Sequence, residues 1–186
     1  MKENLKLGGI LLIISALAGL LLSVAFSITK GPIAETERAN KIAAMKQLLP
    51  DAENFEAVQI ENKEGILDVQ KALKGGKDLG YCINVSSKGY GGPINMMIGI
   101  SADGQVKGVQ ILTLSETPGL GSHAKDPEFK DQFNNKNANE LEVIKEGSPS
   151  DNQILAISGA TITSKAVTAG VNNAINLFND TLKGAK

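Results

Sequence analysis

The sequence contains no tryptophan, one histidine and one cysteine among its 186 residues. A lone cysteine cannot form an intrachain disulfide, and with a single histidine it cannot supply the ligands of a structural zinc site. The net charge is −1, so the basic excess of a nucleic-acid-binding surface is lacking. These absences exclude a disulfide-stapled module, a cysteine zinc domain and a nucleic-acid binder, and we predict no metal site.

Charge is also absent from residues 7–28, whose only polar side chains are those of Ser15, Ser23 and Ser27. At about 1.5 Å per residue, an α-helix of this length crosses the roughly 30 Å hydrocarbon core of a bilayer. We therefore predict that residues 1–30 form a short cytoplasmic tail and a single transmembrane anchor.

A cleaved signal peptide is the competing interpretation of this segment. Lys2 and Lys6 could form its basic region, and residues 23–25 resemble a small-residue cleavage site. The apolar run is longer than the roughly 7–15 residues of a signal-peptide core, which favours an uncleaved anchor. Because basic residues flank the run on both sides, charge alone leaves its orientation open.

Residues 31–50 predict an amphipathic connecting helix that begins after Gly31-Pro32 and ends before Pro50. Beyond it the apolar period shifts toward two, which predicts strands rather than helices. The expected strands are residues 55–60, 66–70, 80–86, 94–101, 105–113, 141–145 and 153–157. Cys82 falls in one of them, as a half-buried strand residue.

Two further signals complete an α+β domain over residues 51–186. Asp103-Gly104 separates two apolar-alternating runs and predicts a two-residue hairpin of type I′. Asp126-Pro127 resembles a helix start, with Phe129 and Phe133 as its buried face. A last helix is expected at residues 164–182, with Val167, Val171, Ala174, Ile175 and Phe178 facing the core.

The stretch "SGATITS", residues 158–164, lies between a predicted strand and this last helix. Unpaired N–H groups and the macrodipole make a helix start favourable for an anion. Small Gly159 and Ala160 allow close approach, and Thr161 offers a hydroxyl at the turn. Alternatively the hydroxyls, above all those of Thr163 and Ser164, merely cap the helix. The stretch is not a P-loop, because Lys165 follows the glycine at the wrong spacing.

Two other glycine-rich turns favour the ligand interpretation. "LSETPGLGSH", residues 114–123, contains Pro118-Gly119, which suits a type II turn. "KGYGGPI", residues 88–94, carries Tyr90, one of two tyrosines. Several glycine and hydroxyl turns in one small domain indicate a ligand pocket.

Taken together, "SGATITS", "ETPGLG", "GYGGPI" and the N-terminal apolar run resemble the G subunit of the Rnf electron-transport complex over nearly the whole chain. The C subunit of the Na⁺-translocating NADH:quinone reductase has the same FMN-binding domain. The resemblance implies an electron-carrier subunit of a membrane-bound ferredoxin:NAD⁺ oxidoreductase, without a complete active site or catalytic residues of its own. It also implies a single-pass protein of the cell (inner) membrane, with an extracytoplasmic FMN domain.

The resemblance further implies that FMN is attached through its phosphate to the hydroxyl of Thr161. Ser158, Gly159, Ala160, Thr163 and Ser164 would surround the phosphate. The flavin would be bordered by Glu116, Thr117, Gly119, Leu120 and Tyr90. The implied partners are the other membrane and redox subunits of the complex and a flavin transferase for maturation.

Two positions depart from the family's pattern: Leu155 stands where an Asp is usual, and Leu114 where a His is frequent. His123 lies beyond the glycines and does not replace that histidine. Two other functions stay open from the residues: a membrane-anchored, non-catalytic FMN-binding or assembly module, and a secreted binding protein without a cofactor.

Overall fold

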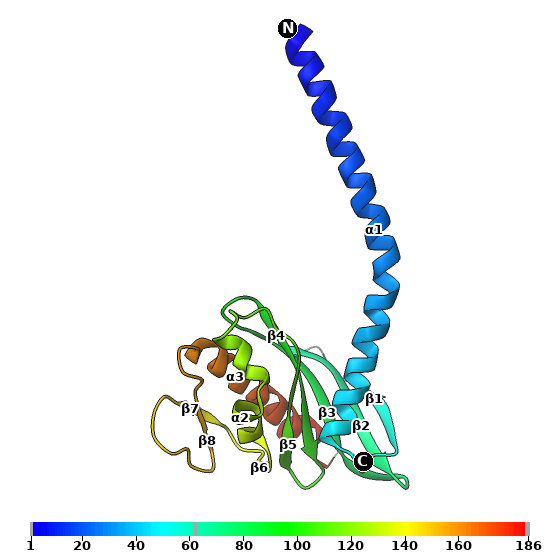
Figure 1. The fold of residues 1–186 in the computed structure, drawn as a ribbon. Helices are drawn as coiled ribbons and strands as arrows, with labels where there is room; N and C mark the ends of the chain where they lie inside the picture. Colours follow the sequence, from blue (N-terminus) through cyan, green and yellow to red (C-terminus); the bar gives the residue numbers. More distant parts are fainter. Residues whose placement is uncertain (1, 62, 185–186) are drawn as a thin grey trace. The chain divides into compact units, whose positions relative to one another are not determined.

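The computed structural model describes residues 2–61 and 63–184 of the chain and divides it into two compact units, Met1–Asn40 and Lys41–Lys186 (Figure 1). Helix α1, Lys2–Leu48, begins in the first unit, and its last turns belong to the second. The second unit combines a large antiparallel sheet with helices packed on it. The predicted α+β class, with one long apolar N-terminal helix before a compact domain, is confirmed.

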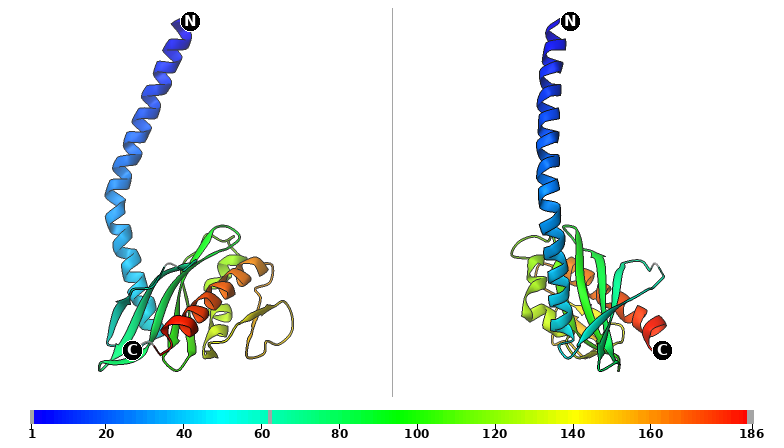
Figure 2. Two further views of the ribbon diagram at one scale, coloured as in Figure 1. Left: turned by 180° about the vertical axis from the view of Figure 1, so that it is seen from behind. Right: turned by 90° about the vertical axis from the view of Figure 1, so that its right-hand side faces the viewer.

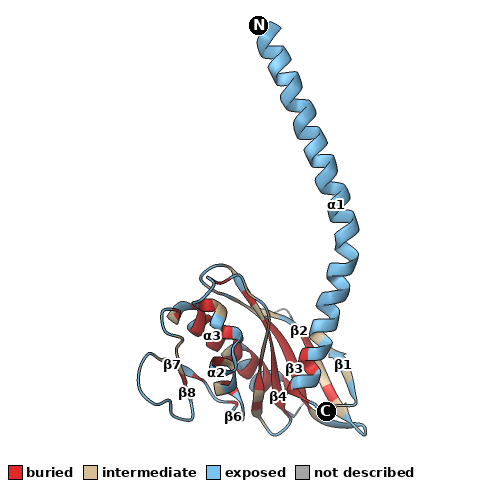
Figure 3. Cartoon of the chain, in the orientation of Figure 1, coloured by how far each residue is buried: buried red, intermediate tan, exposed pale blue. Residues whose placement is uncertain are grey.

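The first unit is helical throughout its described length, and its side chains are exposed (Figure 3). Its apolar stretch is long enough to cross a membrane. The predicted helix break at Gly31-Pro32 is wrong, because α1 continues through Pro32. A proline removes one backbone donor from a helix, and good helix formers such as Ala34, Glu35 and Glu37 follow it directly.

The main sheet has the strand order β1-β2-β3-β4-β5-β6, and every neighbouring pair is antiparallel. Its strands are β1 Asn54–Val58, β2 Ile66–Lys74, β3 Lys77–Lys88, β4 Pro93–Ser101, β5 Gln105–Thr113 and β6 Lys136–Asn137. A second, two-stranded parallel sheet pairs β7 Glu142–Ile144 with β8 Gln153–Leu155. The predicted strands all exist, with shifted ends, whereas β6 was not predicted.

Short helical turns connect β5 to β6: η1 Gly121–Lys125, α2 Pro127–Lys130 and η2 Asp131–Phe133. Asp126 precedes Pro127 as predicted, although its side chain makes no capping hydrogen bond. Phe129 and Phe133 are buried and meet edge to face. The last helix, α3 Thr161–Leu177, passes into the π-helical turn η3 Phe178–Leu182, so it begins three residues earlier than predicted.

Each face of the main sheet carries its own apolar cluster. Helix α3 crosses one face (Figure 2) and buries Val167, Val171, Ala174 and Ile175, and η3 buries Phe178; these are the residues predicted from helical spacing. On the other face the end of α1 places Met45 and Leu48 against Cys82 and Met97. Cys82 is fully buried, which raises the pKa of its thiol to about 12. The cysteine is therefore a packing residue.

The hairpin between β4 and β5 exists, but its predicted turn type is wrong. The loop has three residues, Ala102 to Gly104, and of these only Gly104 has a positive φ, of 86°. The N–H of Gly104 donates to the carbonyl of Ser101 over 2.9 Å. This arrangement is a type I turn closed by a left-handed glycine, the usual geometry of a three-residue hairpin loop.

A notch in the sheet receives Leu48 of α1. Gly99 and Gly108 face each other across β4 and β5. A Cβ on Gly99 would lie 2.8 Å from Leu48 Cβ, whereas one on Gly108 would first meet Asn134 Oδ1 at 2.6 Å and would reach Leu48 Cδ2 at an ordinary 3.4 Å. The missing side chains let the helix end approach the sheet backbone and bury Leu48.

We predict that Gly99→Ala destabilises the second unit by about 1–3 kcal/mol, since the added methyl overpacks the notch. Leu48→Gly in the same chain should recover part of this loss, because it removes the Cβ that the new methyl would meet at 2.8 Å, and chemical denaturation of the full chain in detergent measures the coupling. Gly92→Ala is the matched control, because its Cβ would meet Ser115 at an ordinary 3.5 Å. Additive effects of Gly99→Ala and Leu48→Gly would contradict the notch.

Candidate functional site

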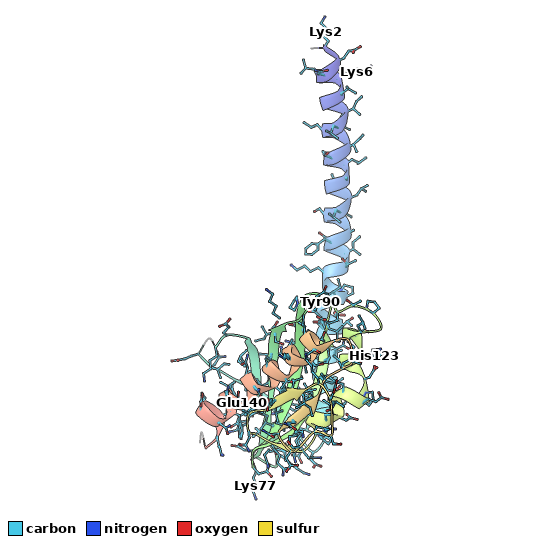
Figure 4. The ribbon with its side chains drawn as sticks, turned by 90° about the vertical axis from the view of Figure 1, so that its left-hand side faces the viewer. Lys2, Lys6, Lys77, Tyr90, His123 and Glu140 are labelled. Carbon is cyan, nitrogen blue, oxygen red and sulfur yellow. The ribbon has the colours of Figure 1, made fainter. Side chains whose placement is uncertain are left out.

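Three turns meet at one pocket of about 610 Å³, a volume typical of small-molecule sites. The turns are those after β3, after β5 and before α3. The lining residues are Tyr90, Glu116, Thr117, Leu120, Gly121, Gly159, Ala160, Thr161, Ile162 and Thr163. Tyr90 and His123 lie toward one end of the second unit, and Lys77 lies at the other (Figure 4).

The turn after β5 has the predicted type II geometry. The N–H of Leu120 donates to the carbonyl of Thr117 over 3.2 Å, and Gly119 between them has a φ of 75°. Pro118 occupies the position where its fixed φ is favourable. The turn aims Leu120 at the glycine of the opposite turn, where a Cβ on Gly159 would meet Leu120 Cδ2 at 3.1 Å.

The start of α3 has no side-chain cap. Its N-cap residue is Ala160, and no acidic residue lies in its first turn. Over residues 2–61 and 63–184, no acceptor takes the N–H groups of Thr161, Ile162 and Thr163, whereas that of Ser164 donates to Ala160. Unsatisfied donors at the positive end of the macrodipole form a site for an anion.

The hydroxyls predicted to cap this helix are used elsewhere. Ser164 is fully buried, where its Oγ accepts from the N–H of Ile157 and donates to the carbonyl of Ala160, both over 3.0 Å. Thr163 donates to Glu116 over 2.7 Å. The capping interpretation of Thr163 and Ser164 is therefore wrong, because both side chains lie inside the turn and hold its shape.

Thr161 is the first residue of α3 and lines the pocket. It is only half-buried, and within the described part of the chain its hydroxyl has no hydrogen-bond partner. Its neighbours Ser158 and Thr163 differ: Ser158 faces the adjacent pocket, and Thr163 is bonded to Glu116. Thr117 also lines the pocket with a hydroxyl that has no partner among the described residues, but it lies on the turn after β5, whereas the hydroxyl of Thr161 stands at the start of α3.

Glu116 joins the three turns through its carboxylate. Oε1 accepts from the backbone N–H groups of Tyr90 and Gly91 over 2.9 and 3.1 Å, and Oε2 accepts from Thr163 over 2.7 Å. The residue is 7% exposed. Buried hydrogen bonds to a charged acceptor are strong, so this carboxylate fixes the turn after β3 against the start of α3.

Glycines leave the room that this carboxylate needs. A Cβ on Gly89 would lie 2.2 Å from Glu116 Oε1, and one on Gly121 would lie 2.7 Å from Oε2. A Cβ on Gly91 would lie 2.1 Å from the carbonyl oxygen of Ser115. The glycines of two motifs are thus required by close packing around Glu116.

Apolar side chains are exposed at the pocket. Tyr90 is 71% exposed, Leu120 43% and Ile162 56%. Of the described residues in Lys41–Lys186, the other exposed large apolar side chains are those of Ile42 and Leu67. Exposed apolar residues concentrated at one pocket indicate a surface that a planar or apolar ligand group covers.

The structure brings together most of the residues predicted from the sequence. Of the predicted set, Tyr90, Glu116, Thr117, Leu120, Gly159, Ala160, Thr161 and Thr163 line this pocket, whereas Gly119, Ser158 and Ser164 do not. The sequence analysis missed Gly121 and Ile162. Ile162 could have been found as an apolar residue that departs from the buried spacing of α3.

A second pocket of about 470 Å³ adjoins the first through Gly119 and Ser158. Leu155 lines it, with its N–H and carbonyl bonded to the side chain of Gln132 over 2.7 and 3.2 Å. His123 Nδ1 lies 2.6 Å from Asp126 Oδ2. This hydrogen bond, the largest cause, raises the pKa of His123 above its ordinary value.

Comparison with known sequences identifies a family model, the FMN-binding domain, over residues 89–176. This range includes the three turns. The chain is 38% identical to the G subunit of the Na⁺-translocating ferredoxin:NAD⁺ oxidoreductase complex of Acetobacterium woodii, over 98% of this chain and 95% of that one. It is also 38% identical to the G subunit of the proton-translocating ferredoxin:NAD⁺ oxidoreductase complex of Clostridium ljungdahlii, over 86% of this chain and 83% of that one.

The fold is similar to that of the C subunit of the Na⁺-translocating NADH-quinone reductase of Parabacteroides distasonis. The TM-score is 0.61 at 18% identity, with 82% of this chain and 96% of that chain covered. This likeness supports the α+β assignment.

We predict that Glu116→Ala lowers the free energy of unfolding by about 2–4 kcal/mol, since three donors lose their acceptor. Glu116→Gln should cost less, because its carbonyl can still accept from Tyr90 and Gly91. Denaturant unfolding measures both. In a double-mutant cycle, the effects of Glu116→Gln and Thr163→Val on the free energy of unfolding should not be additive. Additive effects would show that the hydrogen bond from Thr163 to Glu116 contributes nothing to stability.

His123 can be titrated cleanly by NMR, because it is the chain's only histidine when no tag is added. Its raised pKa means that the ion pair stabilises the folded state below about pH 6.5 and that this contribution is lost as pH rises through the folded-state pKa. We expect Asp126→Asn to return the pKa toward 6.5. Glu128→Gln should have a smaller effect, and equal shifts would contradict the assignment to Asp126.

Proposed function

Because the chain belongs to the family of G subunits of Rnf-type ion-translocating ferredoxin:NAD⁺ oxidoreductase complexes, we propose that it is the electron-carrier subunit of such a complex and holds FMN covalently through Thr161. One observation carries the proposal: an unpartnered threonine hydroxyl, within the described part of the chain, stands at an uncapped helix N-terminus inside a pocket of suitable size.

The residues of the pocket fit the two chemical halves of FMN. The N–H groups of Ile162 and Thr163 and the positive end of α3 would hold the phosphate. Tyr90, Leu120 and Ile162 offer exposed apolar surface for the flavin ring. When bound, the flavin supplies the redox chemistry.

Glu116 serves this site by position. Both of its oxygens are taken by hydrogen bonds within the chain, so it sets the spacing of the turns around the pocket. Glu116 lines the same pocket, and its place at the border of the flavin stays a prediction. The role of the chain is to fix the ring, limit its contact with water and tune its potential.

Formation of the tether requires an activated flavin donor that carries a phosphoanhydride. The bond from Thr161 Oγ1 to phosphorus would form while the anhydride P–O bond would break, and the hydroxyl proton would pass to a base or to the departing phosphate group. The product is a phosphodiester with one negative charge, which the start of α3 stabilises. A separate flavin transferase would catalyse this transfer from the donor to Thr161.

The domain plan follows from the same proposal. Residues 1–30 would anchor the protein in the cell (inner) membrane. Residues 31–50 would connect this anchor to residues 51–186, which would form an extracytoplasmic FMN domain. The apolar helix α1 and the membership in a family of membrane-complex subunits support the anchoring. Other membrane and redox subunits of the complex would be its partners. A non-catalytic assembly module is the alternative function.

We predict that the intact mass of the purified chain exceeds that of the sequence by one FMN less one water, and that Thr161→Val abolishes this increase. Thr117→Val is the matched control and should keep it, since it removes the same hydroxyl from another threonine of the same pocket. An increase that survives Thr161→Val would sink the covalent assignment. If Thr161→Val prevents assembly of the complex, the assembly role is favoured over electron transfer.

A further inference from the structure

Helix α3 carries a single charged side chain. Over Thr161–Leu177 its sequence is TITSKAVTAGVNNAINL, and Lys165 is the one ionised residue. Lys165 is exposed, and no ion pair or hydrogen bond of its ammonium is found among residues 2–61 and 63–184. Because α3 has only this one charge, the position of Lys165 determines how the charged side chains of the helix interact with its macrodipole.

The position of Lys165 is electrostatically unfavourable in the chain alone. The positive end of the macrodipole lies in the first turn of a helix, where acidic side chains stabilise and basic ones destabilise, and Lys165, the fifth residue of α3, directly follows that turn. Here the first turn holds no acidic residue, and the N-cap is an alanine without a capping group. Free N–H groups and a cation of like sign therefore stand together without an anion.

Helix geometry directs this cation toward Thr161. Residues four apart lie on the same face of an α-helix, and side chains tilt toward the helix N-terminus. Lys165 is four residues after Thr161 and three after Ile162, both of which line the pocket. Lys165 itself is not among the lining residues, but a stem that follows this tilt would bring its ammonium toward the hydroxyl of Thr161.

We propose that Lys165 is a further cofactor-positioning residue, whose ammonium pairs with the phosphodiester on Thr161 and neutralises its charge. The inference rests on the proposed function, since it needs the phosphate on Thr161. It goes beyond it by explaining why a lysine stands near the positive end of α3. Lys165 then destabilises the unmodified chain and stabilises the flavin-loaded chain.

The opposite signs of these effects give the test. Lys165→Gln removes the charge at nearly equal helix propensity. It is made in the flavin-loaded full chain and in the Thr161→Val chain, which cannot be loaded, and melting temperatures are measured by calorimetry in a mild detergent. Lys145→Gln is the matched control, because it removes the same charge from the exposed loop after β7. Intact mass first establishes the loading of each sample.

We expect Lys165→Gln to lower the melting temperature of the loaded chain and to raise that of the Thr161→Val chain, each by about 1–3 °C. Both shifts should shrink at high salt. The change in melting temperature caused by Lys145→Gln should have the same sign in the loaded chain and in the Thr161→Val chain. Shifts of the same sign in both chains would overturn the role of Lys165 while leaving the tether intact. Absence of the flavin mass from the wild-type chain would overturn the tether and this inference together.

Discussion

The site depends on one buried carboxylate. Glu116 accepts hydrogen bonds from the backbone of the turn after β3 and from Thr163 in the first turn of α3. Its own turn follows β5, so one side chain connects three segments that are separated in sequence. Gly89 and Gly121 leave it the space to do so, because a Cβ at either position would collide with its oxygens. The "GYGG" and "ETPGLG" motifs are thus required by the same contact, and the pocket lies between them.

A consequence of this contact is that the start of α3 remains open. Thr163 bonds to Glu116 and Ser164 bonds to the backbone around Ile157, so neither hydroxyl caps the helix. The free N–H groups and the half-buried hydroxyl of Thr161 then lie at the same helix start, and the proposed role of Lys165 is to bring a cation to it. The charge pattern is unfavourable in the chain alone and becomes balanced when a phosphodiester occupies it. We infer that the start of α3 is arranged to bind the phosphate of the cofactor.

Sequence reasoning captured the elements whose signals are local. The alternation of β4 and β5, the helical spacing of Val167 to Phe178 and the turn at Pro118-Gly119 each follow from a few neighbouring residues. It failed where contacts between residues far apart in the sequence determine the local structure. The capping role assigned to Thr163 and Ser164 is wrong because their partners, Glu116 and Ile157, become neighbours only in the fold. The notch that Gly99 and Gly108 form for Leu48 likewise depends on residues far apart in the chain.

The central claim is that a flavin phosphate is bonded to Thr161 at the start of α3. An experimental structure of the chain isolated from its own membrane tests this most directly. The account predicts continuous density from Thr161 Oγ1 to phosphorus, with the phosphate oxygens at the N–H groups of Ile162 and Thr163. Density for the flavin in the pocket beside His123, with Thr161 unmodified, would contradict it.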